Sequence, residues 1–157
     1  LPFLLLAGAG AGFLALNWPP ARIFMGDVGS GFVGFALAAL ALAAHAEGSL
    51  PIWGSATLLG VFVADATVTL LVRLARGENV LAAHRSHAYQ RMAIRCGAHR
   101  PVTVGTWAIN LLWLLPWAWL ADAYPEHGAA ACGIAVAPLV VLALVAGAGR
   151  AVGGSGR

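Results

Sequence analysis

The stretch GAAACGIAVAPLVVLALVAGAG at residues 128–149 contains no Asp, Glu, Lys or Arg. A helix needs about 20 mostly apolar residues to cross the hydrocarbon core of a bilayer. Backbone groups in lipid must find their hydrogen-bond partners inside the protein, which favours a helix for such a run. The stretch therefore predicts a membrane-spanning helix.

Four more stretches have this character, at residues 1–16, 28–46, 48–72 and 101–121, with Asp65 as the only interruption. Together they predict an all-α, polytopic transmembrane helix bundle of about five spans. Of the 157 residues, 61% are hydrophobic and 10% are charged, whereas soluble domains average about 45–50% apolar and about 25% charged residues. This composition excludes a soluble enzyme, a nucleic-acid-binding protein and a disordered tail.

The nine basic residues are all arginines, and their positions predict an orientation. They lie in the first and third links between spans, at about residues 17–30 and 73–100, and in the C-terminal tail. The second link, near Glu47, and the fourth, at residues 122–127, are acidic. Alternate links lie on opposite sides of a membrane, and the positive-inside rule assigns the arginine side to the cytoplasm. We therefore expect a multi-pass protein of the inner (plasma) membrane with two cytoplasmic loops and no nucleic-acid partner.

The ends of the chain carry two further expectations. Leu1 lies within an apolar run and no basic segment precedes it, which is not typical of a signal peptide. We interpret residues 1–157 as a single integral-membrane domain, the C-terminal portion of a longer protein. The glycine-rich tail after Gly147 is expected to be frayed and to have no role.

The first cytoplasmic loop contains NWPPARIFMGDVGSG at residues 17–31. Gly26 and Gly29 flank Asp27, so the backbone there can approach a ligand closely. Ser30 can cap the following helix, whose N-terminal amides and dipole favour anions. A carboxylate beside such a helix start suits Mg²⁺ that bridges to phosphates. The alternative is that Asp27 is only a helix cap in a turn.

The second cytoplasmic loop contains HRSHAYQR at residues 84–91. On a helix, His84, His87 and Arg91 share one face. Two imidazoles and a guanidinium suit phosphate recognition. Two alternatives stay open: a zinc pair, for which no third ligand is evident, or a basic amphipathic segment lying on anionic lipid headgroups.

Asp65 lies inside the third predicted span. An ionisable residue within a membrane segment is costly, and it suggests a functional site by default. The alternative is a structural carboxylate that is hydrogen-bonded within the bundle, for example to Thr67 or Thr69. The residue types leave these two interpretations open.

The pattern N17-x-x-P-A-x-I-F-M-G-D27-x-G-S30 resembles a signature of the polyprenyl-phosphate N-acetylhexosamine-1-phosphate transferases. This is glycosyltransferase family 4, which includes the phospho-MurNAc-pentapeptide translocase of peptidoglycan synthesis. HRSHAYQR is similar to the family's His-containing cytoplasmic loop. The resemblance is close over residues 15–95 and extends to the last two spans only by hydropathy.

The resemblance implies an Mg-dependent transferase. An N-acetylamino-sugar 1-phosphate would pass from a UDP-sugar to polyprenyl (undecaprenyl) phosphate, with release of UMP. Asp27 would bind Mg²⁺, with Mn²⁺ as the alternative ion, and Asp65 matches an acidic position in the family's helix before the His loop. The implied substrate-binding residues are Asn17, Phe24 at the uridine pocket, Gly26 and Ser30. The implied catalytic residues are His84, Arg85, His87 and Arg91.

The sequence also departs from the family. The family's Asp-Asp pair on an earlier cytoplasmic loop is absent, and only about half of its ten or eleven spans are present. We therefore expect the C-terminal half of a longer enzyme, inactive alone, with a homodimer as an option. His-Arg-Ser-His differs from the triple-His form of the peptidoglycan enzyme and is more like members that initiate O-antigen (lipopolysaccharide) or other surface polysaccharides. The alternatives are phospho-MurNAc-pentapeptide transfer, or a transporter or channel that uses Asp65.

Overall fold

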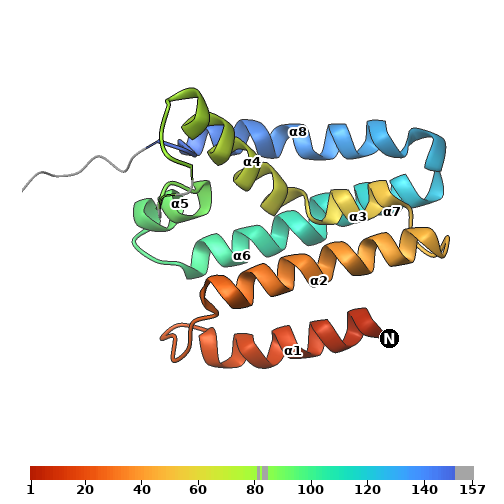
Figure 1. Cartoon of the computed structure of the whole chain (residues 1–157), viewed down its shortest axis with the longest axis horizontal. Helices are drawn as coiled ribbons and strands as arrows, with labels where there is room; N and C mark the ends of the chain where they lie inside the picture. Colours follow the sequence, from red (N-terminus) through yellow and green to blue (C-terminus); the bar gives the residue numbers. More distant parts are fainter. Residues whose placement is uncertain (81, 83–84, 151–157) are drawn as a thin grey trace, which may run out of the picture. The chain divides into compact units, whose positions relative to one another are not determined.

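The computed structural model describes residues 1–80, 82 and 85–150 (Figure 1). Within these residues the secondary structure is helical and contains no strand, which confirms the all-α class. The chain divides into two compact units, Leu1–Ile52 and Trp53–Arg157, which are described separately below. The single integral-membrane domain stays a prediction.

Among the described residues, three helical segments are long and apolar enough to cross a membrane: Gly26–Ala46, Arg100–Ala123 and Pro125–Ala146. The pair Ile52–Leu58 and Gly60–Ala75 adds a fourth if the bent pair is one span. The helix Pro2–Asn17 has 16 residues, fewer than the roughly 20 that a crossing needs. A helical membrane bundle is therefore confirmed, with the first of the five expected spans present as a shorter apolar helix.

The first unit consists of α1 (Pro2–Asn17) and α2 (Gly26–Ala46) with the link between them. The side-chain amide of Asn17 donates to the carbonyl of Ile23 at 2.7 Å. The backbone N–H of Arg22 donates to Leu16 O at 2.9 Å. These two bonds close the link as a compact loop between the helices.

The second unit begins with α3 (Ile52–Leu58) and α4 (Gly60–Ala75), which meet at an angle of 72°. At this break a Cβ on Gly60 would lie 3.1 Å from Val136 Cγ2 and 3.5 Å from Leu114 Cδ1. Small residues allow helices in membranes to approach each other closely. Gly60 therefore lets the start of α4 pack against two later helices of the unit.

The short helix α5 (Ala88–Cys96) precedes α6 (Arg100–Ala108), the π-helical segment η1 (Ile109–Leu114) and α7 (Leu115–Ala123). The π-helical segment lies directly before Pro116. Proline cannot donate a backbone hydrogen bond, and its ring crowds the carbonyl one turn earlier. A wider π turn at this place accommodates both effects.

The short 3₁₀ turn η2 (Pro125–His127) leads into α8 (Gly128–Ala146), which packs along α4 and α7. Small residues dominate the buried positions of α8, including Ala131, Ala135, Ala143 and Ala146. The indole N–H of Trp113 donates to Ala135 O at 2.9 Å. Close backbone packing and this bond hold the two last spans together.

The arginines of the second unit gather at one end, where Glu78 also lies. One end, on the left of Figure 1, holds the C-terminal end of α4, the helix α5, the start of α6 and the end of α8. Seven arginines lie at this end: Arg73, Arg76, Arg85, Arg91, Arg95, Arg100 and Arg150. Asp122 and Glu126 lie at the other end, around α7 and η2. The separation agrees with the predicted alternation of links, and its assignment to the cytoplasm stays a prediction.

Candidate functional site

Asp27 lies in the first turn of α2, where its side chain is exposed. Met25 is the N-cap residue and makes no side-chain capping bond. The first amides of a helix have no partner within it, and the helix dipole favours negative charge at this end. Asp27 thus presents a carboxylate beside a set of backbone donors.

The prediction that Ser30 caps α2 is wrong. The helix begins one turn earlier, at Gly26, and the hydroxyl of Ser30 donates back to the carbonyl of Asp27 at 3.1 Å. Gly26 has φ +68°, a left-handed conformation that favours glycine. The N-terminus of α2 therefore lies ahead of Ser30.

The other predicted substrate-binding residues lie around the same helix start. Asn17 uses its amide N–H₂ to hold Ile23 O, so it stabilises the loop. The side chain of Phe24 is 83% exposed on this loop. No atom lies within 4 Å of a Cβ placed on Gly26, so space is open above its backbone. The loop therefore leaves an aromatic ring and an open backbone segment next to Asp27.

The carboxylate of Asp27 can contribute only part of a metal site. The described residues contain no group of three or more His, Cys, Asp or Glu that could hold a metal ion. Mg²⁺ is usually bound by one or two carboxylates together with substrate phosphates and water. Asp27 fits an ion that is held mainly by a phosphate-bearing ligand and does not fit a metal cage built from the protein alone.

The His/Arg motif of the second unit is folded differently from the expectation. His84 lies outside the described residues. His87 is the N-cap residue of α5 and has extended backbone angles, so the helix begins only after it. The expectation that His87 and Arg91 share a helix face is therefore wrong, because His87 precedes the helix. Arg85 is exposed just before this cap.

Asp65, on α4, caps α5 from the neighbouring helix. Its Oδ1 accepts hydrogen bonds from Ala88 N at 2.8 Å and Thr69 Oγ1 at 3.1 Å, and its Oδ2 accepts one from Tyr89 N at 3.2 Å. Oδ1 also lies 3.5 Å from His87 Nδ1. The carboxylate therefore satisfies two orphan amides at the start of α5. This environment agrees with the interpretation of Asp65 as a structural carboxylate, with Thr69 as its hydrogen-bond partner on α4.

Arg91, on α5, contacts the end of α8. Its Nε donates to Ala146 O at 3.1 Å and its Nη1 donates to Arg150 O at 2.9 Å. The backbone N–H of Gly149 donates to Ser86 O at 2.8 Å. Gly149 and Arg150 are thus bonded to the motif, and the expectation of a frayed tail is wrong for residues 148–150. Residues 151–157 lie outside the described part of the chain.

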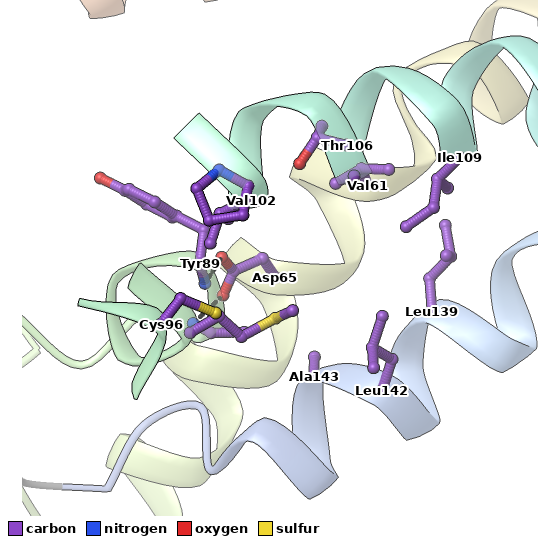
Figure 2. A pocket seen from close by; sticks show the side chains of 14 residues that line it. Val61, Asp65, Tyr89, Cys96, Val102, Thr106, Ile109, Leu139, Leu142 and Ala143 are labelled. Carbon is purple, nitrogen blue, oxygen red and sulfur yellow. Dashed lines mark hydrogen bonds between the residues drawn. The ribbon is translucent and has the colours of Figure 1, made fainter. Parts of the chain in front are cut away.

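A cavity of about 150 Å³ lies between α4, α5, α6 and α8, with Asp65 at its polar side (Figure 2). Its other lining residues are mostly apolar, such as Ile109 and Leu139. A second cavity of about 420 Å³ shares Asp65 and Tyr89 with the first, and His87 also lines it. Asp65 therefore lines both cavities, beside the first turn of α5.

Arg73 is a residue of this region that the sequence interpretation missed. It is 4% exposed, and it donates to Glu78 Oε2 at 3.2 Å and Asn79 O at 2.6 Å. It thereby orders the turn that follows α4. A signal was present, because Asp65, Thr69 and Arg73 are spaced by four residues and so lie along one face of a helix.

Comparisons with known proteins support the predicted family resemblance. Residues 1–45 match the family model described as glycosyl transferase family 4. A phospho-N-acetylmuramoyl-pentapeptide-transferase of Granulibacter bethesdensis is 46% identical over 69 residues, which are 44% of this chain and 17% of that protein. A transferase of the same name from Ruegeria pomeroyi is 38% identical over 111 residues, 68% of this chain and 29% of that protein.

A probable undecaprenyl-phosphate N-acetylglucosaminyl 1-phosphate transferase of Bacillus subtilis is 32% identical over 106 residues, 62% of this chain and 28% of that protein. The chain thus spans less than a third of the length of these relatives. No solved structure matches it. The matches confirm the resemblance predicted from the motifs: residues 1–45 match glycosyl transferase family 4, and the apolar helices agree with a membrane protein.

Proposed function

We propose that the protein containing this chain transfers an N-acetylamino-sugar 1-phosphate from a UDP-sugar to polyprenyl phosphate, with release of UMP. The observation that carries the proposal is the exposed Asp27 at the N-terminus of α2, inside the 45 residues that match the family model. The names of the relatives support the reaction class. Because the chain spans less than a third of those relatives, we expect these 157 residues alone to be inactive.

In this proposal Asp27 is the ligand that the chain contributes to Mg²⁺. Phosphoryl transfer depends mainly on positioning and on neutralising the charge of the phosphates, and a bound Mg²⁺ supplies that neutralisation. The open backbone at Gly26 and the first amides of α2 would bind phosphate oxygens. The exposed ring of Phe24 would stack on the uracil base.

The residues of the second loop would bind the phosphates or the sugar. His87 is held at the cap of α5 and its side chain is 30% exposed, so the imidazole can reach a ligand. Arg85 is exposed beside it and can form charge-assisted hydrogen bonds. His84 completes the proposed set. We propose that both loops face the cytoplasm, where UDP-sugars would be available, and that the membrane is the inner (plasma) membrane.

Two finer assignments belong to the proposal. The His-Arg-Ser-His form favours an enzyme that initiates a surface polysaccharide of the O-antigen type, and phospho-MurNAc-pentapeptide transfer is the alternative that two relatives' names support. A transporter that uses Asp65 as an ion site is disfavoured. Its two oxygens accept three hydrogen bonds from α4 and α5, which gives this carboxylate a structural role.

The test is UMP release by the complete protein encoded by the gene that contains this sequence, purified in lipid nanodiscs with polyprenyl phosphate. We expect Mg²⁺-dependent release with a UDP-N-acetylamino-sugar, and its loss in Asp27→Asn. Asp122→Asn, an exposed acid elsewhere in the chain, is the matched control and should retain activity. Unchanged release by Asp27→Asn would refute the metal role. Comparing UDP-N-acetylglucosamine with UDP-MurNAc-pentapeptide decides between the two substrates.

A further inference from the structure

The end of α8 makes three separate contacts with the His/Arg motif. Arg91 donates to two of its carbonyls, Ala146 O and Arg150 O, and Gly149 donates to Ser86 O. The acceptors of Arg91 lie 55 and 59 residues away along the chain. The last helix is thus connected to the residues on both sides of His87.

The turn that ends α8 has a shape that depends on its glycines. Gly147 has φ +84°, and Ala148 N donates to Ala143 O at 3.0 Å. This pattern is typical of a Schellman C-cap. A Cβ on Gly147 would lie 2.9 Å from Arg91 Nε, so a side chain at this position would displace the guanidinium.

The same turn also contacts α4. A Cβ on Gly149 would lie 2.6 Å from Val72 Cβ and 2.8 Å from Thr69 O. Ala148 between the two glycines is 1% exposed. The negative end of the α8 dipole favours a cation at this place, and Arg91 supplies it. The turn is therefore packed between α4 and α5 and is not a loose end.

We infer that Arg91 is a positioning residue, which acts with the C-terminal turn of α8 to fix His87 for the reaction. Asp65 holds the start of α5 from the α4 side, and Arg91 holds the helix from the α8 side. His87 lies at the N-cap, directly before the amide held by Asp65 and directly after Ser86, whose carbonyl is held by Gly149. The inference rests on the proposed function. It assigns Arg91 to the positioning of His87 and not to direct contact with the substrate.

The two roles of Arg91 predict different kinetics. A residue that binds substrate phosphate should change KM, and it should not depend on the backbone of α8. A positioning residue should change kcat, because a displacement of about 1 Å in a catalytic group can cost up to about 100-fold in rate. Its substitution should also not add to the effect of substituting Gly147, because both changes disrupt the same contact.

The test uses the complete protein in lipid nanodiscs and six variants, two of which are controls. We expect Arg91→Met and Gly147→Ala each to lower kcat by about 10- to 100-fold, with KM for the UDP-sugar within about twofold of wild type. The double variant should be no slower than the slower single variant, since the two changes break one contact. Arg95→Met, an exposed arginine of the same helix, and Gly48→Ala, a left-handed glycine with nothing near its Cβ, are the matched controls and should stay near wild type.

The inference is overturned if Arg91→Met raises KM at unchanged kcat, if Gly147→Ala leaves kcat unchanged, or if the two effects multiply. Arg91→Lys keeps a cation at the last carbonyls of α8 and should recover part of kcat even if Arg91→Met folds poorly. A kcat of Arg91→Lys no higher than that of Arg91→Met would contradict the positioning role.

Hydrogen exchange separates this inference from the proposed function. In wild type, the amides of Ala88 and Gly149 are hydrogen-bonded and should exchange slowly. Arg91→Met and Gly147→Ala should increase the exchange of both amides, and Arg95→Met should not. Unchanged exchange in Arg91→Met overturns the inference even if the wild-type protein shows no transferase activity.

Discussion

The carboxylate of Asp65 accepts a hydrogen bond from the backbone N–H of Ala88 at 2.8 Å, across 23 residues of sequence. The bond joins α4, a candidate membrane helix, to the first residue of α5. It makes the position of the His/Arg motif dependent on a residue inside the membrane segment. The predictions below follow from this junction and from the packing around it.

We predict that Asp65→Ala destabilises the protein by about 1–3 kcal/mol, because the amides of Ala88 and Tyr89 lose their acceptor in a partly buried place. Thermal unfolding in detergent micelles measures the effect, and faster hydrogen exchange of α5 locates it. Asp122→Ala removes an exposed carboxylate and serves as the control. Equal melting temperatures of the two variants would contradict the capping role.

Thr69 shares this junction, since its hydroxyl donates to Asp65 Oδ1 at 3.1 Å and the residue is 1% exposed. We predict that Thr69→Val, which keeps the shape but removes the donor, costs about 1 kcal/mol. Thr69→Ser should cost less because it keeps the hydroxyl. In a double-mutant cycle of unfolding free energies, Thr69→Val should cost less when Asp65 is already alanine. Strict additivity would show that the hydrogen bond does not stabilise the fold.

The ion pairs of Glu78 with Arg73 and Arg76 lead us to expect that the stability of the protein depends on pH. Hydrogen bonds from Arg76 and then Arg73 lower the pKa of the Glu78 carboxyl below its usual value. A carboxyl with a lowered pKa in the folded state stabilises the protein above its unfolded pKa, and the contribution disappears as pH falls through the folded pKa. We therefore expect Glu78→Gln to lower Tm at pH 7.

The difference in Tm between Glu78→Gln and wild type should shrink below about pH 4.3, the ordinary pKa of glutamate. Glu126→Gln, at an exposed site at the other end of the second unit, is the control. A difference in Tm that stays constant from pH 7 to pH 3 would show that the two arginines do not stabilise the ionised carboxylate.

Leu114 tests the packing at the bend between α3 and α4. It is 0% exposed and clusters with Ala64, Ala135 and Leu139. We predict that Leu114→Ala leaves a cavity and costs about 2 kcal/mol, read as a lower Tm in micelles. Leu112→Ala changes a 78% exposed side chain of the same π-helical segment and should have little effect. Similar losses of Tm in both variants would contradict the packing described for this cluster.

The local features of the motifs were partly predictable from sequence. A helix after Asp27 was expected from the sequence, but the residue at which α2 begins was not. The helix begins at Gly26, which has a positive φ, and not at Ser30. The five apolar runs also indicated the helices. The break before Gly60 was not visible in them, and neither was the close approach of Val136 and Leu114 at that place.

The roles of the long-range contacts were less predictable. Arg91 was assigned to phosphate binding because guanidinium suits that ligand, whereas in the fold it donates to carbonyls of α8. The tail at Gly147 was expected to be frayed because glycine-rich ends usually lack partners. Its partner is a side chain of α5, and no local pattern points to it.

The sequence by itself determined the helical class, the membrane character, the family and the candidate site residues. These follow from hydropathy, charge order and short motifs, each of which is a property of neighbouring residues. The tertiary structure decided which carboxylate caps α5, which helix end receives Arg91 and which glycines permit close approach. The physical reason is that a hydrogen bond requires both partners within about 3 Å. Asp65 and Ala88, or Arg91 and Ala146, reach that distance only when α4, α5 and α8 are packed together.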